Sequence, residues 1–153
     1  MIIDSKLEFC DAVSAVQAAS TTALIGDVVD LSTASEDQGT VDDPLYLVIT
    51  VDTAFASADS NPVHFELASD AAAAIAVDGS ASQHVVSPTY DVSELTAGRK
   101  LVFALPSGVS KAYEQYLGLL LVTGAGASGV TAGKVNAFLT KDAGQNVAYP
   151  DAI

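Results

Sequence analysis

Short runs in which apolar and polar residues alternate recur along the chain, and they constrain its fold more than any other feature. Three runs show the alternation most clearly: residues 45–52, 62–68 and 100–106. In the first, Leu45, Leu47, Ile49 and Val51 fall on one face. A period of two is typical of β-strands that bury one face, and it does not suit a helix. The sequence therefore predicts a protein built from β-strands.

Further strands are predicted between stretches rich in Gly, Pro, Ser and Asp. Residues 117–122 are apolar at every position but Gly118, as expected of a central strand that is covered on both faces. Weaker candidates are residues 23–31, 83–92 and 133–141, and Pro88 favours a sheet edge for the second of them. With about seven or eight short strands, we expect an all-β antiparallel β-sandwich or jelly roll. Its length suits one domain over residues 1–153.

Helix signals are scarce, so we expect at most one or two short helices. Asp91 with Glu94 three residues later resembles a capping box, and Gly98 ends the segment, which leaves about one turn. Residues 69–79 contain good helix formers but could equally form a loop. Residues 9–20 fit the spacing of a helix and also that of a strand, and both interpretations stay open.

The stretch GAGASG at residues 124–129 has the G-x-G-x-x-G spacing of nucleotide-binding loops. Such a loop holds phosphates only where a helix begins at the glycines. Here β-branched Val130 and Thr131 follow, and residues 133–140 alternate at strand period. We therefore predict a tight connection between two strands and no phosphate site.

The charge of the chain limits its partners. The formal net charge is −13, and residues 1–98 contain only one base, Lys6, so nucleic acid and anionic membranes would be repelled. A solvated acidic surface is one interpretation, and a polar molecule with one end suited to an acidic partner is another. No secretory signal is visible, and the single Cys10 cannot form an internal disulfide, which suits a reducing cytoplasm.

Residues that could support chemistry are few. His64 and His84 are expected at the surface, and one distant Cys10 does not complete a zinc site. The loop acids lack the spacing of a calcium-binding loop, and G-x-S-x-G is absent. We expect no enzyme, no cofactor and no bound metal. The tyrosines considered as exposed platforms for sugars are Tyr90, Tyr113 and Tyr149.

The second half of the chain has a familiar overall pattern. A short turn, an apolar strand and a Pro-containing loop are followed by YLGLLLVTG, a small-residue loop and TAGKVNAFL. This pattern, together with the opening MIIDSKLEFCDAVSAVQAASTTALIGDVVDL, resembles the jelly-roll cement (decoration) proteins of tailed double-stranded DNA phages. The shared segments describe strands and no catalytic site.

The resemblance implies a structural virion protein. Such a protein binds the outer surface of the head, bridges neighbouring major capsid subunits and stabilises the expanded shell. Its partner would be the major capsid protein, it would assemble in the host cytoplasm, and a homo-oligomer (dimer or trimer) is the default on a symmetric lattice. The alternative is a virion spike or fibre β-sandwich domain that binds host glycans.

Two groups of residues are candidates for capsid binding. The first is an extended N-terminal arm, residues 1–9, because Met1, Ile2 and Ile3 form an apolar terminus that docking could order. The same residues could instead begin an edge strand of the domain. The second is a basic set that could gather on one side of the molecule: Arg99, Lys100, Lys111, Lys134 and Lys141.

Overall fold

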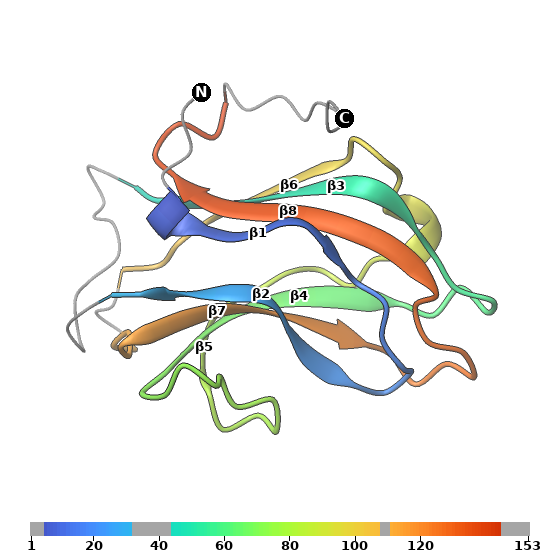
Figure 1. Cartoon of the computed structure of the whole chain (residues 1–153), viewed down its shortest axis with the longest axis horizontal. Coiled ribbons are helices and arrows are strands. Elements are labelled where there is room, and N and C mark those ends of the chain that lie inside the picture. The colour runs from blue at the N-terminus through green and yellow to red at the C-terminus, as the bar shows by residue number, and fades with distance from the viewer. Residues whose placement is uncertain (1–4, 32–43, 108–110, 145–153) are drawn as a thin grey trace.

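The computed structural model describes residues 5–31, 44–107 and 111–144, which form two antiparallel four-stranded sheets packed face to face (Figure 1). One sheet has the strand order β1-β8-β3-β6 and the other β2-β7-β4-β5. The strands are β1 (Glu8–Ser14), β2 (Thr22–Asp30), β3 (Tyr46–Ala56), β4 (Val63–Asp70), β5 (Ser82–Val86), β6 (Lys100–Ala104), β7 (Tyr116–Thr123) and β8 (Ala132–Thr140).

This strand order is that of an eight-stranded jelly roll. Each sheet combines strands far apart in sequence, such as β1 with β8 and β2 with β7. Every pair of neighbouring strands is antiparallel. The prediction of an all-β antiparallel sandwich with seven or eight strands is confirmed.

The core fills the space between the sheets with the side chains that the alternating pattern places on one face. Leu47, Ile49 and Val51 of β3 meet Leu117, Leu119 and Leu121 of β7, and all are almost fully buried. The opposite face of β7 is also covered, because Leu120 packs with Ala68, Ile75 and Ala81 in a second cluster. The central position predicted for residues 117–122 is therefore confirmed.

Gly26 lies where β2 of one sheet comes very close to β1 of the other. It has a positive φ of 70° and lies in a bulge of β2 between Ile25 and Val29. A Cβ atom there would lie 2.1 Å from the carbonyl oxygen of Phe9 in β1. Only glycine permits this conformation and this approach at once. The edge strands β1 and β2 are thereby brought together along one side of the sandwich.

The two ambiguous segments are resolved. Residues 9–20 contain the end of β1 and a connection, so the strand interpretation is correct for residues 9–14. Residues 69 and 70 end β4, and residues 71–79 form a connection of bends without a helix, so the loop interpretation is correct for them. In Figure 1 this connection lies below the β2-β7-β4-β5 sheet, on its outer side.

The helical content agrees with the expectation of one or two short helices. The capping box is present: Ser93 N–H donates to the Asp91 carboxylate, and Asp91 N–H donates to Glu94, at the start of the 3₁₀ turn η2 (Val92–Glu94). A second 3₁₀ turn, η1 (Ser5–Leu7), precedes β1. The predicted edge position near Pro88 is also confirmed, since β5 is an edge strand that ends at Val86.

The predicted arm over residues 1–9 is wrong for its second half. Residues 5–7 form η1, and Glu8 and Phe9 begin β1, with Phe9 buried in the core. The reason is that Phe9 belongs to the apolar face of an edge strand that pairs with β8. Met1, Ile2 and Ile3 lie outside the described residues, so their role in capsid binding stays a prediction.

Candidate functional site

Three connections meet at one end of the sandwich, and we call them together the loop end: residues 15–21, 57–62 and 124–131. The first and third are joined by a reciprocal pair of backbone hydrogen bonds between Gln17 and Val130. Ser20 N–H also donates to the Gly124 carbonyl at 2.8 Å. The GAGASG stretch is thus a strand-to-strand connection, as predicted, and backbone hydrogen bonds join it to the neighbouring connection at Gly124 and just after it at Val130.

Asn61 ties the second connection to the third. Its side chain is 1% exposed, and its Nδ2 donates to the carbonyls of Gly124 at 3.0 Å and Ser128 at 2.9 Å. Its Oδ1 accepts from Gly126 N–H at 3.2 Å. One buried amide therefore contacts three backbone groups of the glycine loop, and at the Gly124 carbonyl it donates in addition to Ser20 N–H.

Asp59 makes a further link from the surface. It accepts a hydrogen bond from Ser128 N–H at 2.9 Å and another from the Ser57 hydroxyl. These bonds, the first above all, stabilise the charged form and hold the pKa of Asp59 below its usual range. The glycine loop that could have cradled a phosphate therefore directs a backbone N–H to a carboxylate of the same chain.

Gly129 permits the close packing of the first and third connections. A Cβ atom at this position would lie 2.1 Å from the Gln17 carbonyl oxygen and 2.8 Å from Cα of Ala18. Both are backbone atoms that cannot move aside without separating the loops. The loop end is therefore a fixed surface, and it presents an apolar side chain, because Val16 is 55% exposed.

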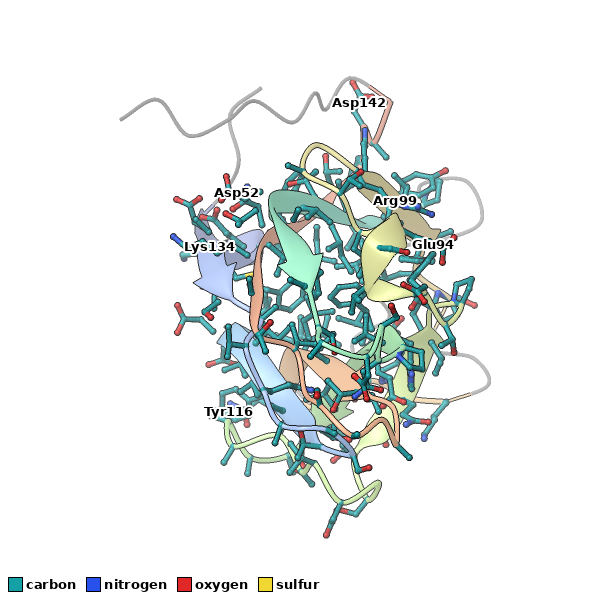
Figure 2. All side chains as sticks on the ribbon, turned by 90° about the vertical axis from the view of Figure 1, so that its right-hand side faces the viewer. Asp52, Glu94, Arg99, Tyr116, Lys134 and Asp142 are labelled. Carbon is teal, nitrogen blue, oxygen red and sulfur yellow. The ribbon has the colours of Figure 1, made fainter. Side chains whose placement is uncertain are left out.

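The structure does not gather the basic set on one side. Lys134 and Arg99 lie on opposite sides of the molecule in Figure 2. Lys134 is on β8 next to Ser14 of β1, whereas Arg99 stacks over the Tyr90 ring at 5.2 Å and donates to the Glu94 carbonyl. Whether these residues bind a capsid stays a prediction, but their separation argues against one shared basic patch.

Of the three remaining bases, Lys100 and Lys141 lie near the β1-β8-β3-β6 sheet and Lys111 does not. Lys100 begins β6 and donates to the Ala143 carbonyl, while Lys141 follows the end of β8. Lys111 belongs to the segment before β7, close enough to His84 to influence its charge. Arg99, Lys100, Lys134 and Lys141 thus lie on or beside β6 and β8 of one sheet, and Lys111 precedes β7 of the other.

His84 is less exposed than the sequence suggested. Its ring stacks on Tyr113 with centroids 3.8 Å apart, and its Nε2 lies 2.7 Å from the Ser69 hydroxyl. Burial, then the positive charge of Lys111, lower the pKa of His84 to about 4, although Glu114 opposes them. Tyr113 is itself buried and cannot serve as a platform for sugars. Tyr149 lies outside the described residues.

Other sources of chemistry are also limited. Cys10 is buried, and this burial is the main reason why the pKa of its thiol is raised to about 12. The raised pKa disfavours the reactive thiolate. Within residues 5–31, 44–107 and 111–144, no group of three His, Cys, Asp or Glu side chains could hold a metal ion. In the same ranges, no helix is long and apolar enough to cross a membrane.

One protein-family model matches the chain over almost the whole sandwich. The Bbp16 family model matches residues 13–139, from the end of β1 almost to the end of β8. The chain belongs to the Bbp16 family. This membership is consistent with a phage protein. No curated protein matches the chain. All three connections of the loop end lie within the matched range of this Bbp16 protein.

Sequence reasoning missed Asn61 as an organiser of the loop end. The signal available was the Asn61-Pro62 pair directly before a strand, a combination that marks turns. Its long-range partners, Gly124 and Ser128, become visible only when β4 and β7 are placed side by side.

Proposed function

We propose that this Bbp16-family chain is a structural virion protein that binds the outer surface of the phage head. In this role it bridges major capsid subunits and stabilises the expanded capsid, without catalysing a reaction. Its partner is the major capsid protein, and it acts as a homo-oligomer on the capsid exterior after assembly in the host cytoplasm.

The observation that carries the proposal is the loop end. Three connections are held in one conformation by Asn61, by paired backbone groups and by the contact at Gly129. A surface that is already ordered loses little conformational entropy when it docks, so more of the contact energy contributes to affinity. The exposed side chain of Val16 offers this surface an apolar group for docking.

Charge and multivalency support the same proposal. A net charge of −13 keeps the protein away from packaged DNA. A protein that contacts several subunits makes each later contact intramolecular, so that modest surfaces add to strong avidity. The glycan-binding alternative is less favoured, because it is expected to use exposed aromatic rings and Tyr113 is buried.

The test is co-sedimentation of the purified protein with expanded phage heads that lack it. We expect saturable binding at a fixed ratio to capsid subunits, and heads that then survive a higher temperature. A well-folded sample that does not bind would reject the capsid role and make a sugar array the next experiment.

A pair of substitutions locates the contact. Val16→Asp places a charge on the exposed valine of the loop end and should weaken head binding at least tenfold. The matched control is Val102→Asp, because Val102 is also an exposed valine, at 41%, but lies on β6 and outside the loop end. Equal loss for both variants would show that binding does not use the loop end.

A further inference from the structure

A cavity of about 300 Å³ lies between the connection from β4 to β5 and the outer face of the β2-β7-β4-β5 sheet. The strands contribute its floor, and the connection contributes its opposite wall. It is lined by Thr22, His64, Glu66, Ala76, Val77, Asp78, Gly79, Ala81, Gln83, Leu120 and Val122.

The lining combines an apolar surface with two carboxylates. Leu120 and Val122 of β7 face Ala76 and Val77 of the connection, and Val77 remains 47% exposed. Glu66 and Asp78 provide the acidic groups, and the described residues of the lining include no Lys or Arg. A cavity of this kind suits a ligand with an apolar stem and a polar or charged end.

Glu66 is a carboxylate in a mostly buried position. Its side chain is 12% exposed, and its oxygens contact His64 Nε2 at 3.0 Å and Gln83 Nε2 at 2.7 Å. Gln83 is neutral, and His64 carries a positive charge only when it is protonated. Glu66 therefore has hydrogen-bond donors but no permanently charged partner in this contact, an arrangement in which a nearby cation is favourable.

Asp78 lies on the wall formed by the connection. The Ser80 hydroxyl donates to its Oδ1 at 2.6 Å and Ser80 N–H donates to the same oxygen at 3.0 Å. These two bonds lower the pKa of Asp78, so the group stays ionised at neutral pH. Since both bonds end on Oδ1, Oδ2 remains available to a donor from a ligand.

We propose that this cavity receives the side chain of an arginine or lysine from the major capsid protein. The aliphatic stem would lie on Leu120 and Val77, and the cationic end would meet Glu66 and Asp78. Arginine fits best, because its planar guanidinium offers five N–H donors to a cavity that both carboxylates line. The identity of the partner rests on the proposed function, whereas the chemistry of the ligand rests on the cavity.

The first experiment tests that chemistry without any capsid. Nα-acetyl-arginine amide is titrated into the full chain while the NMR signals of His64 and Gln83 are followed. We expect saturable shifts with a dissociation constant of about 1 mM, as suits one small contact. Nα-acetyl-citrulline amide, which has the same shape but no charge, should bind at least tenfold more weakly. Equal binding of the two compounds, or no binding of either, would overturn the inference.

Two conservative variants identify the carboxylates. Glu66→Gln should weaken binding of the arginine compound at least tenfold, and Asp78→Asn about threefold. Asp52→Asn removes one negative charge from β3 in the other sheet and should have no effect. If Asp52→Asn weakens binding as much as Glu66→Gln, only the net charge matters and the cavity is not the site.

The second experiment separates this inference from the proposed function. Wild-type and Glu66→Gln proteins are co-sedimented with the heads described above. Binding of the wild type with at least tenfold weaker binding of Glu66→Gln supports both. Equal binding of the two proteins overturns the capsid arginine or lysine while the capsid role stands. If neither binds heads, both the capsid role and the capsid partner fail, and saturable binding of the arginine compound then supports only a cation site.

Discussion

The loop end and the connection over the cavity are both fixed against the sandwich, but by different forces. At the loop end, polar contacts dominate, with Asn61 at their centre. Over the cavity, an apolar contact dominates, because Ile75 is 5% exposed and packs over Gly118 of β7. A Cβ atom at Gly118 would lie 2.7 Å from Cγ1 of Ile75. Asp70 assists by accepting from Ala72 N–H and Ala76 N–H.

One small sandwich can therefore present two surfaces that are held in different ways. Hydrogen bonds have defined directions, so a network of them fixes three loops built mostly from small and polar residues. An apolar anchor leaves the rest of its loop free to carry charges, as Asp78 does beside the cavity. A bridging protein needs two contact surfaces, and these two would respond differently to salt and pH.

The largest expected effect is that of Asn61→Ala. The substitution leaves the Ser128 carbonyl and the Gly126 N–H without their Asn61 partner, whereas the Gly124 carbonyl keeps Ser20 N–H. Each group left unsatisfied costs about 1–3 kcal/mol. We expect a loss of about 3 kcal/mol in the free energy of unfolding, measured by urea denaturation. Ser128→Ala, in the same loop, is the control and should cost less than about 0.5 kcal/mol. Similar losses for both would mean that Asn61 does not organise the loop end.

The strands could be predicted from sequence because their signal is local. Alternation in residues 45–52 and 100–106 identifies the face that packs into the core, and both segments form strands with that face inward. In β3 the opposite face is covered as well, since Val48 and Thr50 are buried. The role of Asn61 could not be predicted, because its partners are more than 60 residues away and depend on which strands become neighbours. A jelly roll pairs strands that are distant in sequence, and alternation does not encode that order.

The candidate site was predicted less well than the fold, for a related reason. The basic set Arg99, Lys100, Lys111, Lys134 and Lys141 occupies a common stretch of sequence but not a common surface. His84 and Tyr113 were assigned to the surface from residue type, yet each covers the other. Residues 69–79 favoured helix or loop equally, and the loop forms because Ile75 packs onto the sheet while Asp70 satisfies nearby N–H groups.

Ile75→Ala should be the next largest effect and should act on the cavity side alone. Removing a buried isoleucine side chain costs about 2–5 kcal/mol, and the lower end is expected here because the cluster around Ile75 is small. We predict a loss of about 2 kcal/mol in unfolding free energy together with loss of arginine binding. Val77→Ala is the control, since Val77 is about half exposed and should change stability by less than about 0.5 kcal/mol. Unchanged arginine binding in Ile75→Ala would show that the anchor does not shape the cavity.

A pH titration should distinguish the two regions through His84, which lies at the base of the connection over the cavity and contacts Ser69. The folded pKa of His84 is about 4, below the usual value of about 6.5 for an unfolded chain. The unfolded state therefore binds more protons between these values, and stability falls as the pH is lowered from about 6.5 to about 4. Because the ring is partly exposed, solvent screening should reduce the effect to about 1–2 kcal/mol.

The measurement is the free energy of unfolding at pH values from 7 to 4 for the wild type and two variants. His84→Gln should remove this pH dependence, whereas His64→Gln, the control, should keep it. The connections at the loop end contain no histidine, so hydrogen exchange there should not follow the same titration. A pH dependence that survives His84→Gln would assign the effect to other groups.

The smallest effects are expected from substituting two aspartates: Asp59, which binds the loop end, and Asp70, which binds the connection over the cavity. Asp59 and Asp70 both have a pKa below the usual range, because backbone N–H groups donate to them, mainly Ser128 to the first and Ala76 to the second. The contribution of each carboxylate to the free energy of unfolding is therefore present above its unfolded pKa, and it is lost as the pH falls through the lower folded pKa. Since Asp59 is exposed and Asp70 is only half-buried, neutral substitutions should alter local opening more than global stability. In amide exchange at pH 7, Asp59→Asn should speed exchange at Ser128 alone, and Asp70→Asn at Ala76 alone. Faster exchange at both amides in either variant would mean that the two regions open together, and that the polar and apolar attachments are parts of one cooperative unit.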